Sequence, residues 1–321
     1  MNLAVCLLAY ALSLTVLGPA VVSRVTRAGA APRWGIAAWL AMMGSVLVAA
    51  VAAVALFVSQ TLASWGRIGA VLTGCVAGLG MIARGGYGDL VQIGVLALAA
   101  MSTLAVAILT GRAALALRRM RRHGHEHGHA VRIATGDTTP RGPGGAFVVD
   151  SDRRGVYCLA GRPHTIVITR AALDALDHTQ LAAVLAHERA HLRGHHHRIL
   201  ALTGALSTLF PRVGLFTHGA AAVARLLEMR ADDVAARRHS PDTVADALLA
   251  LSLPSGTVTA STPAAALSAA GLAVTQRVER LLFPPNAITA RLGLILATGA
   301  ALLAPILGIA LMITQPGMAC I

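Results

Sequence analysis

The chain has 321 residues, of which 56% are hydrophobic and only 13% are charged, with 27 basic residues against 14 acidic ones. This composition is typical of an integral membrane protein and excludes an ordinary soluble domain. All the basic residues are arginine and aromatic residues make up 3%. The net charge of +13 therefore does not indicate nucleic-acid binding, and we attribute it to membrane topology.

Four apolar stretches are long enough to cross a bilayer, which takes about 20 residues. They are residues 3–22, 35–58, 90–110 and 292–313. The first lacks a positively charged start and is predicted to be a retained span, not a signal peptide. A fifth stretch, 68–83, is shorter and rich in glycine, and whether it spans, re-enters or lies at the interface stays open.

Arginines gather after the first span, after the third span and before the last one. The positive-inside rule places these segments in the cytoplasm and the N-terminus outside. If 68–83 crosses the membrane, the N-terminus moves inside, but the same charges keep residues 111–287 cytoplasmic. We expect a multi-pass protein of a bacterial-type plasma membrane.

A basic, histidine-rich linker is predicted over residues 111–145. His123, His125, His127 and His129 alternate there with glycine and Glu126. Such a tract can bind zinc or nickel loosely, and a solvated linker beside the membrane is the simpler interpretation.

The most specific pattern is an H-E-x-x-H motif at residues 187–191. Histidines four residues apart, His187 and His191, share one helix face and can reach one zinc ion. Glu188 can then take a proton from zinc-bound water. The surrounding sequence favours a helix, because residues 181–192 contain good helix formers and no glycine or proline. Asp177 and Gln180 fit a capping box at its start. The alternative is a surface helix with two incidental histidines.

A third ligand is expected downstream. Glu228 and Asp232 lie four residues apart, so they face the same way on a helix. Glu228 can complete a three-ligand zinc site, and Asp232 can accept a hydrogen bond from a ligand histidine and set its tautomer. The alternative is an exposed helix in which Glu228 pairs with Arg225 or Arg230.

The segment between these motifs is apolar and is broken by Pro211. We predict two helices packed within the domain, at 199–210 and 213–224, because each half is too short to span. His195, His196 and His197 follow the motif helix. One of them could approach the metal as an alternative ligand, but we prefer Glu228 and interpret the three histidines as cations at a helix end at low pH.

Together, the H-E-x-x-H motif and Glu228-x-x-Ala231-Asp232 resemble the gluzincin pattern of integral-membrane peptidases. Two groups carry it, the HtpX and CAAX-prenyl-protease type and the BlaR/MecR type. A predicted strand at 165–169 before the motif helix is similar to both groups. The stretch 277–282 before the last span resembles the BlaR/MecR type. The resemblance implies an edge strand that pairs with an extended substrate, formed by Val156, Tyr157, Cys158, Leu159 and Ala160.

We therefore predict a multi-pass α-helical membrane protein with a mainly α (α+β) zinc-peptidase domain inserted before the last transmembrane helix. Residues 1–110 form the N-terminal membrane region and 111–145 the linker. Residues 146–287 form a cytoplasmic metallopeptidase domain, and 288–321 form the last span and a short tail.

The expected activity is that of a zinc metalloendopeptidase with one catalytic Zn²⁺ held by His187, His191 and Glu228. The metal would polarise the scissile carbonyl and acidify bound water, and Glu188 would move the water proton to the leaving amine. The donor to the oxyanion stays open. The candidates are His239, Arg237, Arg238 and His218.

The layout favours the BlaR/MecR type, whose protease inactivates a cytoplasmic repressor after an external signal. The short tail after the last span leads us to expect no extracellular sensor domain. One alternative is an HtpX-like quality-control protease. Another, from a different class, is a non-proteolytic membrane metal binder or sensor that uses the histidine tracts. We expect a protein substrate, contact with the bilayer and no nucleic acid, and the oligomeric state stays open.

Overall fold

The computed structural model describes residues 3–65, 142–159, 165–253 and 264–314, with a few isolated positions between 97 and 115. The predicted span at 90–110 lies largely outside these residues. The stretch 68–83 and the histidine tract at 123–129 lie wholly outside them.

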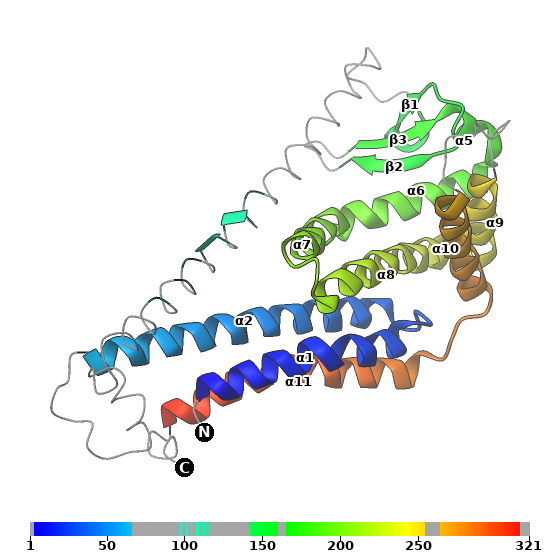
Figure 1. Ribbon diagram of the computed structural model, residues 1–321. Helices are drawn as coiled ribbons and strands as arrows, with labels where there is room; N and C mark the ends of the chain where they lie inside the picture. The colour runs from blue at the N-terminus through cyan, green and yellow to red at the C-terminus, as the bar shows by residue number, and fades with distance from the viewer. Residues whose placement is uncertain are drawn as a thin grey trace.

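Three long apolar helices lie side by side (Figure 1): α1 (Leu3–Thr26), α2 (Pro32–Trp65) and α11 (Ala287–Thr314). Each contains a segment long and apolar enough to cross a membrane. The Tyr10 hydroxyl joins all three, because it lies 2.7 Å from Ser45 Oγ and donates to the Ala301 carbonyl at 3.2 Å. Large apolar side chains such as Leu12 and Leu296 are more than half exposed on these helices, as a lipid-facing surface requires.

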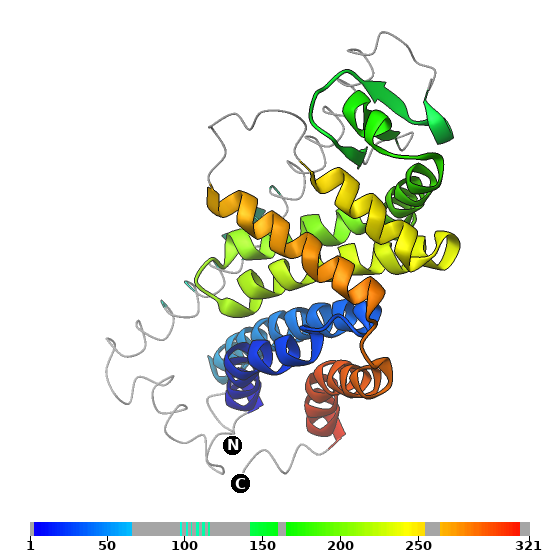
Figure 2. The ribbon, with the colours of Figure 1, turned by 90° about the vertical axis from the view of Figure 1, so that its right-hand side faces the viewer.

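The remaining elements form a helical domain with a small sheet at one end (Figures 1 and 2). In chain order they are η1 (Pro143–Gly145), β1 (Phe147–Val149), β2 (Val156–Leu159), β3 (Thr165–Thr169), α5 (Arg170–Ala175), α6 (His178–Arg193), α7 (His196–Leu209), α8 (Gly214–His239), α9 (Pro241–Ser252) and α10 (Ala264–Leu282). The mainly helical fold and the predicted strand at 165–169 are therefore confirmed.

The sheet has the order β1-β3-β2, with β1 parallel and β2 antiparallel to β3. All five residues of β3 are buried, as expected for a central strand of β-branched residues. The β2 strand forms an edge of the three-stranded sheet, at the place predicted for an edge strand. Its last predicted residue, Ala160, lies outside the described residues.

Helix α6 begins with the predicted capping box. Asp177 Oδ1 accepts hydrogen bonds from the backbone amides of Thr179 and Gln180 at 2.7 and 2.8 Å. Gln180 Oε1 accepts in return from the Asp177 amide at 3.1 Å. These bonds satisfy donors that have no partner within a first helical turn, so the start of α6 is set locally.

The prediction for the apolar segment between the motifs needs a correction. The chain turns between Phe210 and Val213 as expected, but the second helix does not end near residue 224. It continues as α8 through Glu228 to His239, because nothing in this stretch breaks a helix. Neither α7 nor α8 is among the described helices that could span a membrane.

The α8 helix packs directly on the apolar helices. At Gly219, where a Cβ atom would lie 2.9 Å from the Trp39 ring, the missing side chain lets α8 approach α2 closely. Trp39 is fully buried and Met43 is 1% exposed in this contact. The packing gives one continuous apolar core that includes residues of α1, α2, α7, α8 and α11.

Two arginines connect the helical domain, through hydrogen bonds, to the end of α1 and the loop that follows it. Arg225 donates to the carbonyls of Thr26 and Arg27 at 3.0 and 2.8 Å. Arg280 donates to the Gly29 carbonyl at 2.8 Å and to Asp233 Oδ1 at 2.6 Å. The carbonyls at the end of α1 and in the loop accept no hydrogen bond from within a helix, so the two arginines satisfy them. The same bonds hold α8 and α10 against the α1–α2 hairpin.

Candidate active site

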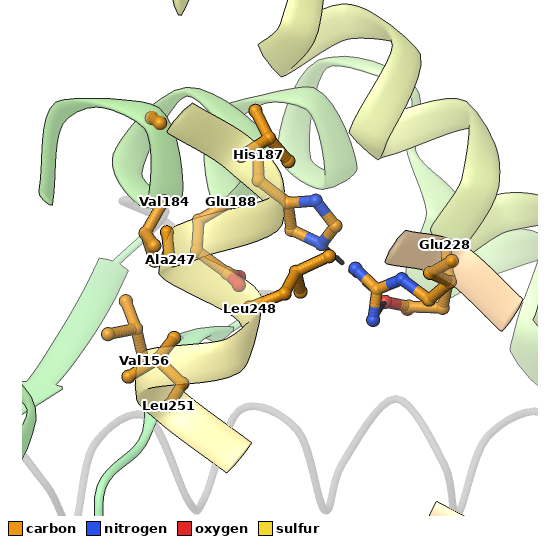
Figure 3. Close-up of a pocket in the computed structure, with 11 residues that line it drawn as sticks. Val156, Val184, His187, Glu188, Glu228, Ala247, Leu248 and Leu251 are labelled. Atoms are coloured by element: carbon orange, nitrogen blue, oxygen red, sulfur yellow. Dashed lines mark ion pairs between the residues drawn. The ribbon is translucent and has the colours of Figure 1, made fainter. Parts of the chain in front are cut away.

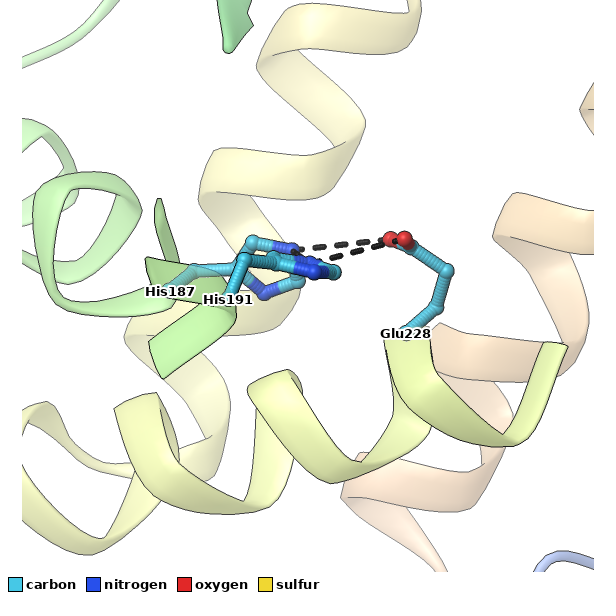
Figure 4. A group of neighbouring side chains, drawn as sticks. All are labelled: His187, His191 and Glu228. Atoms are coloured by element: carbon cyan, nitrogen blue, oxygen red, sulfur yellow. Dashed lines mark hydrogen bonds and ion pairs between the residues drawn. The ribbon is translucent and has the colours of Figure 1, made fainter. Parts of the chain in front are cut away.

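Three side chains with metal-ligand chemistry converge between α6 and α8 (Figure 4): His187, His191 and Glu228. The Nε2 atoms of the two histidines lie 3.0 Å apart. Glu228 Oε2 lies 3.5 Å from His187 Nε2, and Glu228 Oε1 lies 3.4 Å from His191 Nε2. Ligand atoms about 2.0–2.1 Å from a tetrahedral zinc ion lie about 3.3 Å from one another. The spacing and the donor types therefore fit a zinc ion with an open fourth position.

The two histidines present Nε2 to this group because their Nδ1 atoms have other partners. His187 Nδ1 lies 3.0 Å from Asp232 Oδ1, on a carboxylate that is fully buried. This is the contact that the sequence suggested for Asp232. Arg277, from α10, donates to both oxygens of the same carboxylate at 2.7 and 2.8 Å. Burial alone would raise the pKa of Asp232, but these hydrogen bonds hold it at about 2.

His196 contacts and orients His191, a role that the prediction of a helix-end cation at low pH did not include. Its Nδ1 lies 2.9 Å from His191 Nδ1, and the residue is 3% exposed. Burial lowers the pKa of His196 to about 4, so the ring is neutral at pH 7. The turn at Gly194 and His195, which has a left-handed φ of 50°, folds His196 back beneath α6.

The pKa values of His187 and His191 are shifted in opposite directions. Burial lowers the pKa of His187, but its hydrogen bonds to Asp232 and Glu228 outweigh burial and raise the value to about 9. Burial and the neighbouring His187 charge lower the pKa of His191 to about 4. At the 3.0 Å separation of the two Nε2 atoms, a proton on His187 can form a hydrogen bond to the neutral His191 ring. A metal ion bound here takes the place of that proton.

Glu188 occupies the position of a proton-transfer residue. It is 8% exposed, lines a cavity beside His187 and Glu228, and its pKa is raised chiefly by burial (Figure 3). The Cys158 thiol of β2 lies close enough to interact with its carboxylate, and burial raises the pKa of that thiol to about 12. The edge strand β2 therefore lies next to Glu188, which the H-E-x-x-H motif predicts to be the general base.

The structure does not bring the residues proposed as oxyanion donors to this site. Arg237, Arg238 and His239 lie on the last turns of α8, and His218 lies on its first turns. At 1.5 Å per residue, each is about 13 Å or more along the helix from Glu228. Arg277 is present instead, with Nη1 at 3.3 Å from Glu228 Oε2, and it lines the cavity.

The sequence indicates Arg277 only as part of the stretch 277–282 before the last span, with no predicted role in the site. Its spacing to Arg280, three residues on, places both guanidinium groups on one face of a helix. Two arginines on one helix face indicate that this face binds acidic side chains. Which acidic residues it binds depends on the packing of α10 against α8.

Two histidines and a glutamate around a common point, with a buried glutamate beside a sheet edge, define a metallopeptidase-type site. In agreement, residues 143–253 match the family model described as Peptidase family M48. Residues 143–253 are therefore similar to an M48 metallopeptidase domain, and they are joined to helices that are long and apolar enough to span a membrane. No curated protein and no solved structure matches the chain.

Proposed function

We propose that this chain is a membrane-embedded endopeptidase whose metal is zinc. The observation that supports it best is the convergence of His187, His191 and Glu228 within the M48 segment. Neutral imidazoles with one carboxylate suit zinc better than calcium or magnesium, which prefer oxygen ligands alone.

Each side chain has a distinct role in the proposed reaction. Bound zinc supplies a Lewis acid and a water molecule whose pKa is lowered toward 7. Glu188 accepts a proton from the attacking water and returns it to the leaving nitrogen, a role suited to a carboxylate whose pKa burial has raised. Asp232 and His196 keep the ligand histidines oriented. Arg277 faces the same cavity and is our candidate for the donor that stabilises the substrate oxyanion.

The substrate segment binds in an extended conformation along β2. A sheet edge offers unpaired backbone groups, and a peptide that pairs with them passes beside Glu188. The residues of β2 that this pairing uses are Val156, Tyr157, Cys158 and Leu159.

The test compares wild-type protein with Glu188→Gln, both purified in detergent and loaded with zinc. We expect the variant to keep its metal and to lose proteolysis by about 10²–10⁴-fold, the usual contribution of a general base. A His187→Ala variant should lose both metal and activity. Full proteolysis by Glu188→Gln would exclude this mechanism.

We further propose that the peptidase domain is cytoplasmic. Arg24, Arg27 and Arg33 lie at the end of α1 and the start of α2, where Arg225 and Arg280 fasten the domain. The positive-inside rule assigns this end to the cytoplasm. A protease added to sealed inverted vesicles should therefore degrade the domain, whereas in right-side-out vesicles the domain should be protected.

For the cellular role, we propose signal transduction through cleavage of a repressor-like cytoplasmic protein. The contacts of α8 with the α1–α2 hairpin support it, because a change in the membrane helices can reach Glu228 through one rigid helix. The alternative role is quality control of membrane proteins. New protein N-termini in cells that express wild type or Glu188→Gln separate the two. One repressor-like substrate supports signalling, and many membrane substrates support quality control.

A non-proteolytic metal binder built on residues 123–129 makes a different prediction. It requires several weakly bound metal ions that disappear when the tract is deleted. The peptidase requires one tightly bound zinc ion that survives the deletion and is lost in His187→Ala. Metal stoichiometry of these two variants decides between them.

A further inference from the structure

Helices α2 and α8 run in opposite directions and are in contact over the first turns of α2 (Figure 1). A Cβ atom on Gly35 would lie 3.0 Å from Leu226 Cδ1, and one on Gly219 would lie 2.9 Å from the Trp39 ring. Residue numbers therefore rise along α8 as they fall along α2. The start of α2 and the part of α8 after residue 226 come together at the end of the apolar segment that begins at Pro32.

Arginines lie on both helices at this junction. Arg33 is exposed on the first turn of α2. Arg230 lies one turn after Leu226, on the side of α8 that is directed at α2, and Arg237 lies two turns further along the same side. Burial and the positive charges of Arg33 and Arg237 lower the pKa of Arg230, as expected for like charges near one another. We call these three residues the arginine cluster.

The positive charge of the arginine cluster has no counter-charge of its own. Within the described part of the chain, none of its three members forms an ion pair. Asp233 is the acidic neighbour of Arg230, but its Oδ1 atom accepts a hydrogen bond from Arg280 at 2.6 Å. Guanidinium groups that lack a carboxylate partner are suited to an external anion, and they match phosphate oxygens in particular.

The arginine cluster lies at the level of a bilayer surface. Arg33 is the second residue of α2, and the first 25 residues of this helix, Pro32–Leu56, are apolar enough to span a membrane. The guanidinium carbon of Arg33 lies 5.8 Å from the centroid of the Trp34 ring. Tryptophan is enriched at the level of lipid headgroups. An anion bound by Arg33 therefore lies at the depth of the phospholipid phosphates.

We propose that the arginine cluster binds the phosphate group of an anionic phospholipid such as phosphatidylglycerol. Basic sites beside transmembrane helices bind anionic headgroups, and each arginine near the surface contributes about fivefold in affinity. The bound lipid holds α8, which also carries Glu228, at the level of the headgroups. The proposal requires neither the metal nor peptidase activity. It applies to either orientation of the chain, because this end of α2 reaches a bilayer surface in both.

Native mass spectrometry of the full-length protein in detergent measures the affinity for each lipid. Phosphatidylglycerol is compared with phosphatidylcholine of the same acyl chains, which has a phosphate group but no net charge. We expect the wild type to bind phosphatidylglycerol about 100-fold more tightly, the combined contribution of three arginines. A triple variant with Arg33→Gln, Arg230→Gln and Arg237→Gln should bind the two lipids with affinities within about twofold of each other.

Two control variants separate the charge of the cluster from its effect on folding. The same three positions replaced by lysine keep the positive charge, so this variant should retain most of the preference for phosphatidylglycerol. Arg153→Gln removes an exposed arginine in the loop between β1 and β2, far from the apolar helices (Figure 1). It changes the net charge by the same amount as each single glutamine substitution, and it should bind both lipids like the wild type.

The fluorescence of Trp34 provides a second readout that locates the lipid. Bromine atoms on an acyl chain quench a tryptophan that they contact. Brominated phosphatidylglycerol should therefore quench the wild type more strongly than brominated phosphatidylcholine does. Trp34→Phe should abolish this difference, because the remaining tryptophans do not adjoin the cluster, and the triple glutamine variant should abolish it as well.

Three results would overturn the proposal. The first is equal affinity of the wild type for the two lipids. The second is a preference for phosphatidylglycerol that survives in the folded triple glutamine variant, since the anion would then bind elsewhere. The third is displacement of the lipid by an equal concentration of inorganic phosphate, which would show that the cluster binds free phosphate. We expect inorganic phosphate to compete only in large molar excess, because it lacks the acyl chains.

Discussion

His196 Nδ1 lies 2.9 Å from His191 Nδ1, so the first residue of α7 contacts a candidate metal-ligand histidine of α6. His187 has an equivalent partner in Asp232, at 3.0 Å. Each ligand ring is therefore fixed through the nitrogen that faces away from the metal position. The two partners differ in charge, because Asp232 is an anion and His196 is a neutral ring.

Replacing His196 by alanine should weaken metal binding. Loss of such a partner typically costs 10–100-fold in metal affinity, because the ligand ring is no longer oriented. Competition with a fluorescent zinc chelator measures the change. His178→Ala, which removes an exposed histidine at the start of α6, is the control and should bind zinc like the wild type. Unchanged affinity in His196→Ala would show that the helix alone orients His191.

Replacing Arg277 by methionine should destabilise the folded protein. The variant leaves the Asp232 carboxylate buried without its main partner, and breaking a buried pair in this way costs about 3–5 kcal/mol. Thermal unfolding in detergent should show a clearly lower midpoint. In the double variant with Asp232→Asn much of the loss should be recovered, and equal midpoints of the single and double variants would contradict the assignment.

Zinc binding should release at least one proton at pH 7.5. The pKa of His187 is about 9 without metal, so this ring is protonated there and must lose its proton to bind zinc. The pKa of His191 is about 4, so it is already neutral and releases none. Affinity should therefore fall roughly tenfold for each pH unit below 8. Calorimetry in buffers of different ionisation enthalpy counts the protons, and a count near zero would refute the assignment.

A bulky residue at 219 should separate α8 from the membrane helices. The Gly219→Val side chain meets the buried Trp39 ring and Met43, and overpacking of this kind costs about 1–3 kcal/mol. We expect a lower unfolding midpoint and weaker zinc binding, because Glu228 is on the same helix. Gly44→Ala on α2 is the control, since its Cβ atom would meet no neighbour within 4 Å. If Gly219→Val behaves like this control, the α2–α8 contact is unimportant for the site.

The elements with strong local signals could be predicted from the sequence. The capping box of Asp177 and Gln180, the strand at 165–169 and the apolar helices depend on short-range chemistry and hydrophobic patterning. The shared helix face of His187 and His191 followed from the motif and from helical spacing, whereas Glu228 was expected as the third ligand because it is the next glutamate in the chain. The Asp232 contact followed in the same way, because its direction is set by the position of Glu228 on one helix.

The structure was needed wherever a contact joins separate elements. The roles of Arg277 and His196 depend on how α10 crosses α8 and how the turn at Gly194 folds α7 beneath α6. Arg237 and His239 are suitable donors by residue type, but they lie on the last turns of α8, away from the metal group. The sequence by itself determined which residues can bind a metal and which segments are apolar, because these are local properties of side chains. Only the tertiary structure decided which groups orient the ligands and what shape the cavity has, because both depend on long-range packing.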